Sequence, residues 1–174
     1  AKKILNKYNG VFLADVVGLG KTYITALLAR ELKHGRSLVI CPPVLQDYWK
    51  RVLEDFGVSA TVVSLGKLDK IIDEYPNDYF RHIFIDEAHR FRNSATSNYT
   101  KLHQICVDKK VVLISATPQN NYSSDLLNLI SLFQQRNNSN IIEDNPDIED
   151  YSDIMLENIE LHFDKLKEEN TNGI

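Results

Sequence analysis

Two adjacent carboxylates, Asp86 and Glu87, follow directly after a run of apolar residues. A carboxylate at the end of a buried strand can hold Mg²⁺ through a bound water, and its neighbour can orient or deprotonate an attacking water. His89 lies two residues beyond Glu87, where it can relay the state of this pair. Such residues can carry out the hydrolysis of a phosphate anhydride.

A glycine-bearing turn in residues 11–22 joins an apolar run to a helical pattern. Such a turn aims several backbone N–H groups and a helix N-terminus at one point, which favours an anion, and its glycines let the backbone close around a phosphate. Lys21 is placed to reach the β- and γ-phosphates, and the Thr22 hydroxyl to ligate Mg²⁺. The strict G-x-x-x-x-G-K-[ST] spacing is not met, because Asp15 occupies its first position. The residues predicted to bind nucleotide are Gly18, Leu19, Gly20, Lys21 and Thr22.

Two hydroxyls, Ser115 and Thr117, end another apolar run. They can hydrogen-bond to His89 or to a water near the γ-phosphate. Taken alone, they are more typical of a Ser/Thr-rich strand exit closed by Pro118.

A metal site is an alternative interpretation, because the ligand types His82, Asp86, Glu87 and His89 occur together. On an extended strand, however, His82 and Asp86 would lie about 13 Å apart, too far for one ligand shell. An unrelated metal-dependent hydrolase, which would bind metal without nucleotide, is therefore the weaker hypothesis.

The elements that must position these residues alternate between strand and helix. Nearly continuous apolar runs, typical of strands buried on both faces, predict strands over Val11–Asp15, Ser37–Cys41, Thr61–Ser64, His82–Asp86 and Val111–Ser115. Alternation with helices implies right-handed βαβ units and a parallel sheet covered on both sides, with ligands at the carboxyl ends of the strands. Every motif above falls at such an end.

The first helix is predicted over Lys21–His34, with Gly35 as its C-terminal stop and an inward stripe of Ile24, Leu27, Leu28 and Leu32. The second opens at Pro42 and Pro43 and ends at Gly57, with a stripe of Leu45, Tyr48, Trp49, Val52 and Phe56. Further helices are predicted over Leu68–Tyr75, Ser97–Cys106, Ser124–Gln134 and Ser152–Glu169.

Charge is unevenly distributed over the 174 residues, whose net charge is −4. Residues 1–142 carry 18 Lys and Arg against 13 Asp and Glu, whereas residues 143–174 carry 2 against 11. A mildly basic body is compatible with binding to a phosphate backbone, and equally with an ordinary solvated face. The two cysteines, Cys41 and Cys106, are too few for a disulfide framework and are predicted to be buried, reduced thiols.

No apolar run approaches the ~18 residues of a membrane span, and the first residues lack the apolar stretch of a signal peptide. We therefore expect a cytoplasmic protein without a membrane partner.

Four segments occur in a fixed order: Asp15–Thr22, Ile40–Lys50, Asp86–His89 (Asp-Glu-Ala-His, the wording of a DEAH box) and Ser115–Thr117. Together they resemble motifs I, Ia, II and III of superfamily 2 helicases. The resemblance covers roughly residues 10–134 and is closest to the Swi/Snf-type branch of ATP-driven DNA translocases. It implies a RecA-like, three-layer α/β/α fold of the P-loop NTPase type, which binds ATP and Mg²⁺.

Carried over to this chain, the resemblance makes Lys21, Asp86 and Glu87 catalytic, with Thr22 and Asp86 as Mg²⁺ ligands. It assigns the coupling of hydrolysis to DNA to His89, Ser115 and Thr117. It also implies phosphate-backbone contacts by Pro42, Pro43, Ser64 and Lys67, which position nucleic acid without reading its sequence. Trp49 lies on an apolar stripe, so we expect it in the core rather than stacked on a base.

The resemblance implies one lobe of a DNA-dependent ATPase, with residues 1–142 forming the lobe and residues 143–174 an insertion or the start of an inter-lobe segment. A second RecA-like lobe would supply an arginine finger. Duplex DNA is the favoured partner, and RNA remains open. The alternative is a non-hydrolysing scaffold that docks nucleic acid or protein, against which the intact Lys21, Asp86 and Glu87 argue.

Overall fold

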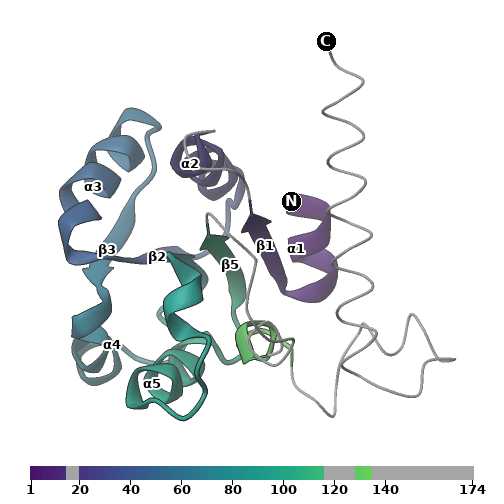
Figure 1. The fold of residues 1–174 in the computed structure, drawn as a ribbon. Coiled ribbons are helices and arrows are strands. Elements are labelled where there is room, and N and C mark those ends of the chain that lie inside the picture. The colour runs from purple at the N-terminus through teal and green to yellow at the C-terminus, as the bar shows by residue number, and fades with distance from the viewer. Residues whose placement is uncertain (15–19, 116–127, 135–174) are drawn as a thin grey trace, which may run out of the picture. The chain divides into compact units, whose positions relative to one another are not determined.

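The computed structural model describes residues 1–14, 20–115 and 128–134. In this part of the chain, five parallel strands form one sheet in the order β1-β5-β4-β2-β3 (Figure 1). The strands are β1 (Gly10–Ala14), β2 (Arg36–Cys41), β3 (Ala60–Ser64), β4 (Phe80–Asp86) and β5 (Lys110–Ser115). The predicted α/β class with a parallel sheet is confirmed, and each predicted strand is present to within one or two residues at either end.

The helices of the described residues are α1 (Lys2–Tyr8), α2 (Lys21–Glu31), α3 (Gln46–Asp55), α4 (Leu68–Glu74) and α5 (Ser97–Cys106). Short 3₁₀ turns cover Pro43–Leu45, Leu65–Lys67 and Ala88–Phe91. The bounds of α5 are those predicted, and its N-terminus is capped by the Thr96 hydroxyl, which accepts a hydrogen bond from the backbone N–H of Tyr99. The helix predicted over 124–134 is described only from residue 128, where one helical turn is present, and the helix predicted over 152–169 lies outside the described residues.

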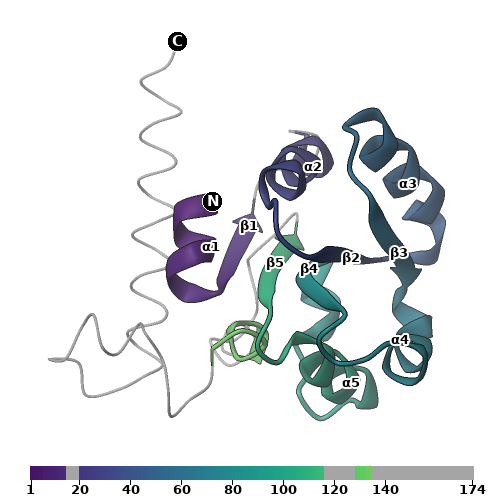
Figure 2. The same ribbon diagram turned by 180° about the vertical axis from the view of Figure 1, so that it is seen from behind.

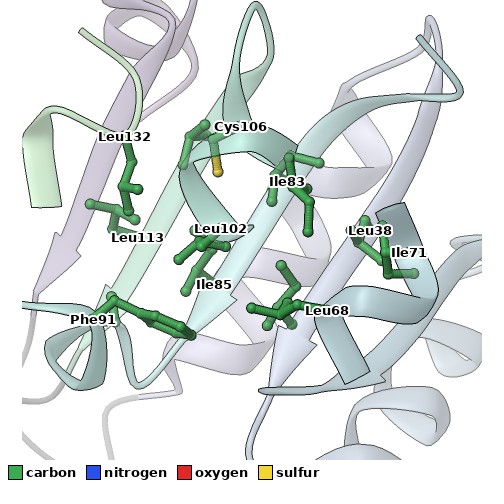
Figure 3. Packing of buried hydrophobic residues seen from close by; sticks show 14 of the residues in the cluster. Leu38, Leu68, Ile71, Ile83, Ile85, Phe91, Leu102, Cys106, Leu113 and Leu132 are labelled. Atoms are coloured by element: carbon green, nitrogen blue, oxygen red, sulfur yellow. The ribbon is translucent and has the colours of Figure 1, made fainter. Parts of the chain in front are cut away.

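Helices cover both faces of the sheet, with α2 and α3 on one side and α4 and α5 on the other (Figures 1 and 2). Side chains alternate along each strand, so that Leu38 and Ile40 face the cluster that includes residues of α4 and α5, while Val39 and Cys41 face the cluster that includes residues of α2 and α3. The first cluster, shown in Figure 3, joins strand residues such as Ile83 and Ile85 to Leu68, Leu102 and Phe91. The second cluster contains Trp49, Phe84 and Ile114.

The predicted inward stripe of α2 is wrong at two positions, because Ile24 is 46% exposed and Leu27 is 41% exposed. The residues buried against the sheet are Thr25, Ala26, Leu28 and Ala29. These mostly small side chains let the helix backbone approach the sheet closely, which turns the larger residues outward. The helix also ends at Glu31 rather than His34, so Gly35 lies in the following loop instead of serving as the stop.

The prediction for α3 fares better. Trp49 and Val52 are buried and Gly57, at φ +66°, ends the helix as expected, whereas Tyr48 is 38% exposed. Both cysteines are buried and free, as predicted.

Strand register brings the ends that carry the motifs together. Ala14 pairs with Ser115, and Ile114 pairs with Asp86, so the carboxyl ends of β1, β5 and β4 are neighbours. None of the helices in the described ranges combines the length and apolar character that a bilayer crossing requires.

Candidate nucleotide site

Asp86 closes β4 with its side chain on the face covered by α2 and α3, because it follows Phe84 with the period of two of a strand. Its carboxylate is half-buried and both oxygens accept hydrogen bonds. Oδ2 accepts from the indole Nε1 of Trp49 at 2.8 Å, and Oδ1 accepts from the backbone N–H of Glu87 at 2.9 Å. The carboxylate is therefore held by donors on two different elements.

Burial raises the pKa of Asp86, while the hydrogen bonds from Trp49 and from the Glu87 backbone lower it. The Glu87 charge raises the pKa again, and the ammonium of Lys21 lowers it. Lys21 begins α2, so its charge acts on Asp86 across two elements. Beside this carboxylate on β2, burial and the Asp86 charge raise the pKa of the Cys41 thiol to about 12, which keeps that thiol neutral.

The start of α2 is set by Gly20, which stands at the N-cap with φ +79°. This left-handed conformation favours glycine. Lys21 and Thr22 form the first turn and are half-buried. The Thr25 hydroxyl donates to the carbonyl oxygen of Lys21 at 2.7 Å and reinforces that turn. Two predicted nucleotide-binding residues, Gly18 and Leu19, lie outside the described residues.

Glu87 adopts a left-handed backbone conformation, with φ 54° and ψ 44°. Its Oε2 lies 3.2 Å from Nδ1 of His89, and the same nitrogen lies 3.3 Å from Oγ of Ser115. Glu87, His89 and Ser115 thus form a continuous set of contacts from the end of β4 to the end of β5. Thr117, the remaining predicted coupling residue, is outside the described ranges.

The residues predicted to contact phosphates lie at or just after the carboxyl ends of β2 and β3. Pro43 and Lys67 are exposed, whereas Pro42 and Ser64 are buried and present little side-chain surface. Trp49 is 0% exposed, so its assignment to the core rather than to a base-stacking surface is confirmed.

Sequence reasoning missed the hydrogen bond from Trp49 to Asp86. A buried indole N–H usually requires an acceptor, and that requirement is the signal that could have prompted the search for one. The acceptor is 37 residues away along the chain.

The donor set fits Mg²⁺ better than a transition metal. Asp86 and Thr22 offer a carboxylate and a hydroxyl, the hard oxygen donors that Mg²⁺ prefers. Within the described ranges, no three His, Cys, Asp or Glu side chains come together to hold a metal ion.

The sequence of this chain is similar to one protein family and to several individual proteins. Residues 50–141 match the SNF2-related domain family. An ATP-dependent helicase of Bacillus subtilis, YqhH, is 31% identical over 159 residues, covering 77% of this chain and 28% of that protein. Human DNA repair and recombination protein RAD54B is 27% identical and is covered over 16% of its length.

A solved structure, the Sulfolobus solfataricus SWI2/SNF2 ATPase core in complex with double-stranded DNA, has a similar fold. Its TM-score is 0.57 at 22% identity, and the match covers 71% of this chain and 31% of that one. The chain thus spans less than a third of the length of these proteins.

Proposed function

The chain belongs to the SNF2-related domain family, and we propose that it is the nucleotide-binding lobe of a motor that couples ATP hydrolysis to movement on nucleic acid. The observation that carries the proposal is the convergence of Lys21, Asp86, Glu87 and Ser115 at one edge of the parallel sheet. This edge is formed by the carboxyl ends of the strands, which is where ligands bind in open α/β sheets. The favoured track is duplex DNA in the cytoplasm, with RNA as the other nucleic acid to test.

In this proposal the first turn of α2 receives the nucleotide phosphates. Lys21 places its ammonium against the β- and γ-phosphates. Thr22 and Asp86 would hold Mg²⁺, which would offset the negative charge of the triphosphate. Glu87 orients a water in line with the γ-phosphorus and accepts its proton as the new P–O bond forms and the bond to ADP breaks. His89 and Ser115 carry the state of the Glu87 carboxylate toward the nucleic acid.

Nucleic acid would lie over the carboxyl ends of β2 and β3 and the turns that follow them, where Pro42, Pro43, Ser64 and Lys67 are found. Pro43 and Lys67 have the exposure that direct contact requires. Backbone N–H groups at these turns would position the phosphates without reading the bases.

We further propose that residues 1–142 form one lobe of a two-lobed motor and that the acidic residues 143–174 are an insertion or lead toward the second lobe. The relatives are more than three times the length of the matched segment, which supports a partner lobe in the same polypeptide. Because an arginine finger can supply about 10³–10⁵ in rate, the isolated lobe should hydrolyse ATP very slowly.

The decisive experiment measures ATP turnover by the two-lobed protein alone and with single strands, duplex DNA and RNA, beside its Glu87→Gln variant. Turnover that rises with duplex DNA and vanishes in the variant supports the motor. Equal rates in all conditions, or none, favour instead a scaffold that retains the fold without using ATP.

A further inference from the structure

Trp49 meets Asp86 in a way that simple packing does not require. Its ring belongs to the second cluster, with Val39, Cys41 and Phe84, and is 0% exposed. Its only polar atom, Nε1, points at the carboxylate and lies 2.8 Å from Oδ2. The indole therefore joins the hydrophobic core directly to the candidate metal-binding side chain.

We infer that Trp49 is the positioning residue that fixes the orientation of the Asp86 carboxylate for the magnesium–nucleotide complex, an inference that rests on the proposed function. A carboxylate at the end of a strand can rotate about its terminal bond. The two donors remove that freedom, because the Glu87 N–H holds Oδ1 while the indole holds Oδ2.

Each carboxylate oxygen has a second lone pair that remains available after it accepts one hydrogen bond. Since an indole N–H donates and never accepts, Trp49 always presents the same partner to Oδ2. Because the Trp49 ring has no exposed surface, it cannot rotate out into solvent as the side chain of a surface lysine can. The bond from α3 thus sets which lone pairs of Asp86 face the start of α2.

A purely structural role for Trp49 makes a different prediction. If the ring only fills the core, then removing the N–H while keeping the ring shape should leave ligand binding unchanged. If Trp49 orients Asp86, the same change should weaken the part of nucleotide affinity that depends on Mg²⁺ and spare the rest.

The test uses the 174-residue chain, in which Trp49 is the one tryptophan, so that an analogue incorporated for tryptophan changes a single site. Benzothienylalanine has sulfur in place of the indole N–H and nearly the same shape. Trp49→Phe is the genetically encoded variant, and Val52→Ala, on the same helix and in the same cluster, is the matched packing control. Calorimetry gives the affinity for ADP with Mg²⁺ and with a chelator.

The quantity compared is the affinity for ADP with Mg²⁺ divided by the affinity for ADP with the chelator. We expect this ratio to fall about 10- to 100-fold in the benzothienylalanine protein and in Trp49→Phe, because loss of an outer partner of a metal ligand has an effect of that size. The affinity without Mg²⁺ and the ratio in Val52→Ala should stay within about twofold of the unmodified chain. An unchanged ratio in the benzothienylalanine protein, or an equal fall in Val52→Ala, would overturn the inference alone. An unmodified chain that binds no ADP under either condition would overturn the proposed function, and this inference with it.

Discussion

Nδ1 of His89 lies 3.3 Å from Oγ of Ser115, so that the turn after β4 contacts the last residue of β5. The same ring nitrogen lies 3.2 Å from a carboxylate oxygen of Glu87. One imidazole therefore contacts both the residue proposed to orient water and a neighbouring strand end. In a motor, this is the position from which a change at the γ-phosphate could reach the segment that follows β5.

Ser115→Ala removes the hydroxyl side of this contact. A hydrogen bond of this kind contributes about 1 kcal/mol, so we expect stimulation of ATP turnover by duplex DNA to fall about fivefold while nucleotide affinity stays nearly constant. Steady-state turnover with and without DNA in the two-lobed protein measures this. Ser37→Ala, a buried serine at the opposite end of the sheet, is the control. An equal loss in both variants would mean that Ser115 acts only through stability.

The left-handed backbone of Glu87 predicts an unusual order of stability among its variants. The left-handed conformation destabilises a residue that has a Cβ by about 1–2 kcal/mol. Glu87→Gly should therefore be more stable than Glu87→Ala by about 1 kcal/mol. At Arg51, exposed in the middle of α3, the order should reverse, because glycine is the poorer helix former there. Urea unfolding of the four variants measures both differences, and the same order at both positions would contradict the prediction.

Stability should fall in mild acid because of His82, which is 4% exposed. Burial lowers its pKa, the nearby Lys110 and Arg81 charges lower it further, and its Nδ1 has no hydrogen-bond partner among the described residues. Below about pH 6.5, the unfolded chain binds a proton that the folded chain excludes. The free energy of unfolding should therefore decrease as the pH drops from about 6.5 toward the lowered pKa, by up to about 1.4 kcal/mol per pH unit.

This pH dependence can be assigned by comparing two variants. Urea unfolding at about pH 7.5 and about pH 5.5 should show a smaller pH effect in His82→Phe than in the unmodified chain. The His82 contribution should persist in His34→Gln, because His34 is exposed. A pH effect in His82→Phe as large as that of the unmodified chain would assign it to other groups.

Gly10 and Phe133 make contact at the start of β1, and a Cβ added at Gly10 would overlap the Phe133 ring. Overpacking of this kind costs about 1–3 kcal/mol, so Gly10→Ala should be destabilising by about that amount. Most of the cost should disappear in a Phe133→Ala background, which makes room for the added methyl group. A double-mutant cycle followed by thermal unfolding measures the coupling, and simple additivity would show that the clash is relieved elsewhere.

The sheet was largely predictable because strands buried on both faces appear as unbroken apolar runs, as in Ser37–Cys41 and Val111–Ser115. The face of α2 was not. Hydrophobicity ranks Ile24 and Leu27 above Thr25 and Ala29, yet the small residues pack on the sheet because they allow close approach. Helix α1 was missed because Leu5 is its one buried residue, too little to create a periodic pattern.

The candidate site could likewise be predicted from the sequence only in part. Lys21, Asp86 and Glu87 could be named as candidates from residue type, since each stands at or next to the end of a predicted strand or at the start of a predicted helix. The second donor to Asp86 could not, because contact with Trp49 depends on how closely α3 packs over β4. Local patterns predict elements, whereas distances between elements depend on the side chains that separate them.

The order β1-β5-β4-β2-β3 has a consequence for how the chain is made. During synthesis, β2, β3 and β4 leave the ribosome as neighbours that can already pair, whereas β5 is the one strand of the described residues that pairs with β1. Strand β1 can therefore join the sheet only after β5 has been synthesised, and α2, which follows β1 in the chain, cannot be fixed at its N-terminal end before then. A ribosome stalled before Lys110 would display a partial sheet unable to assemble the strand end that precedes Lys21.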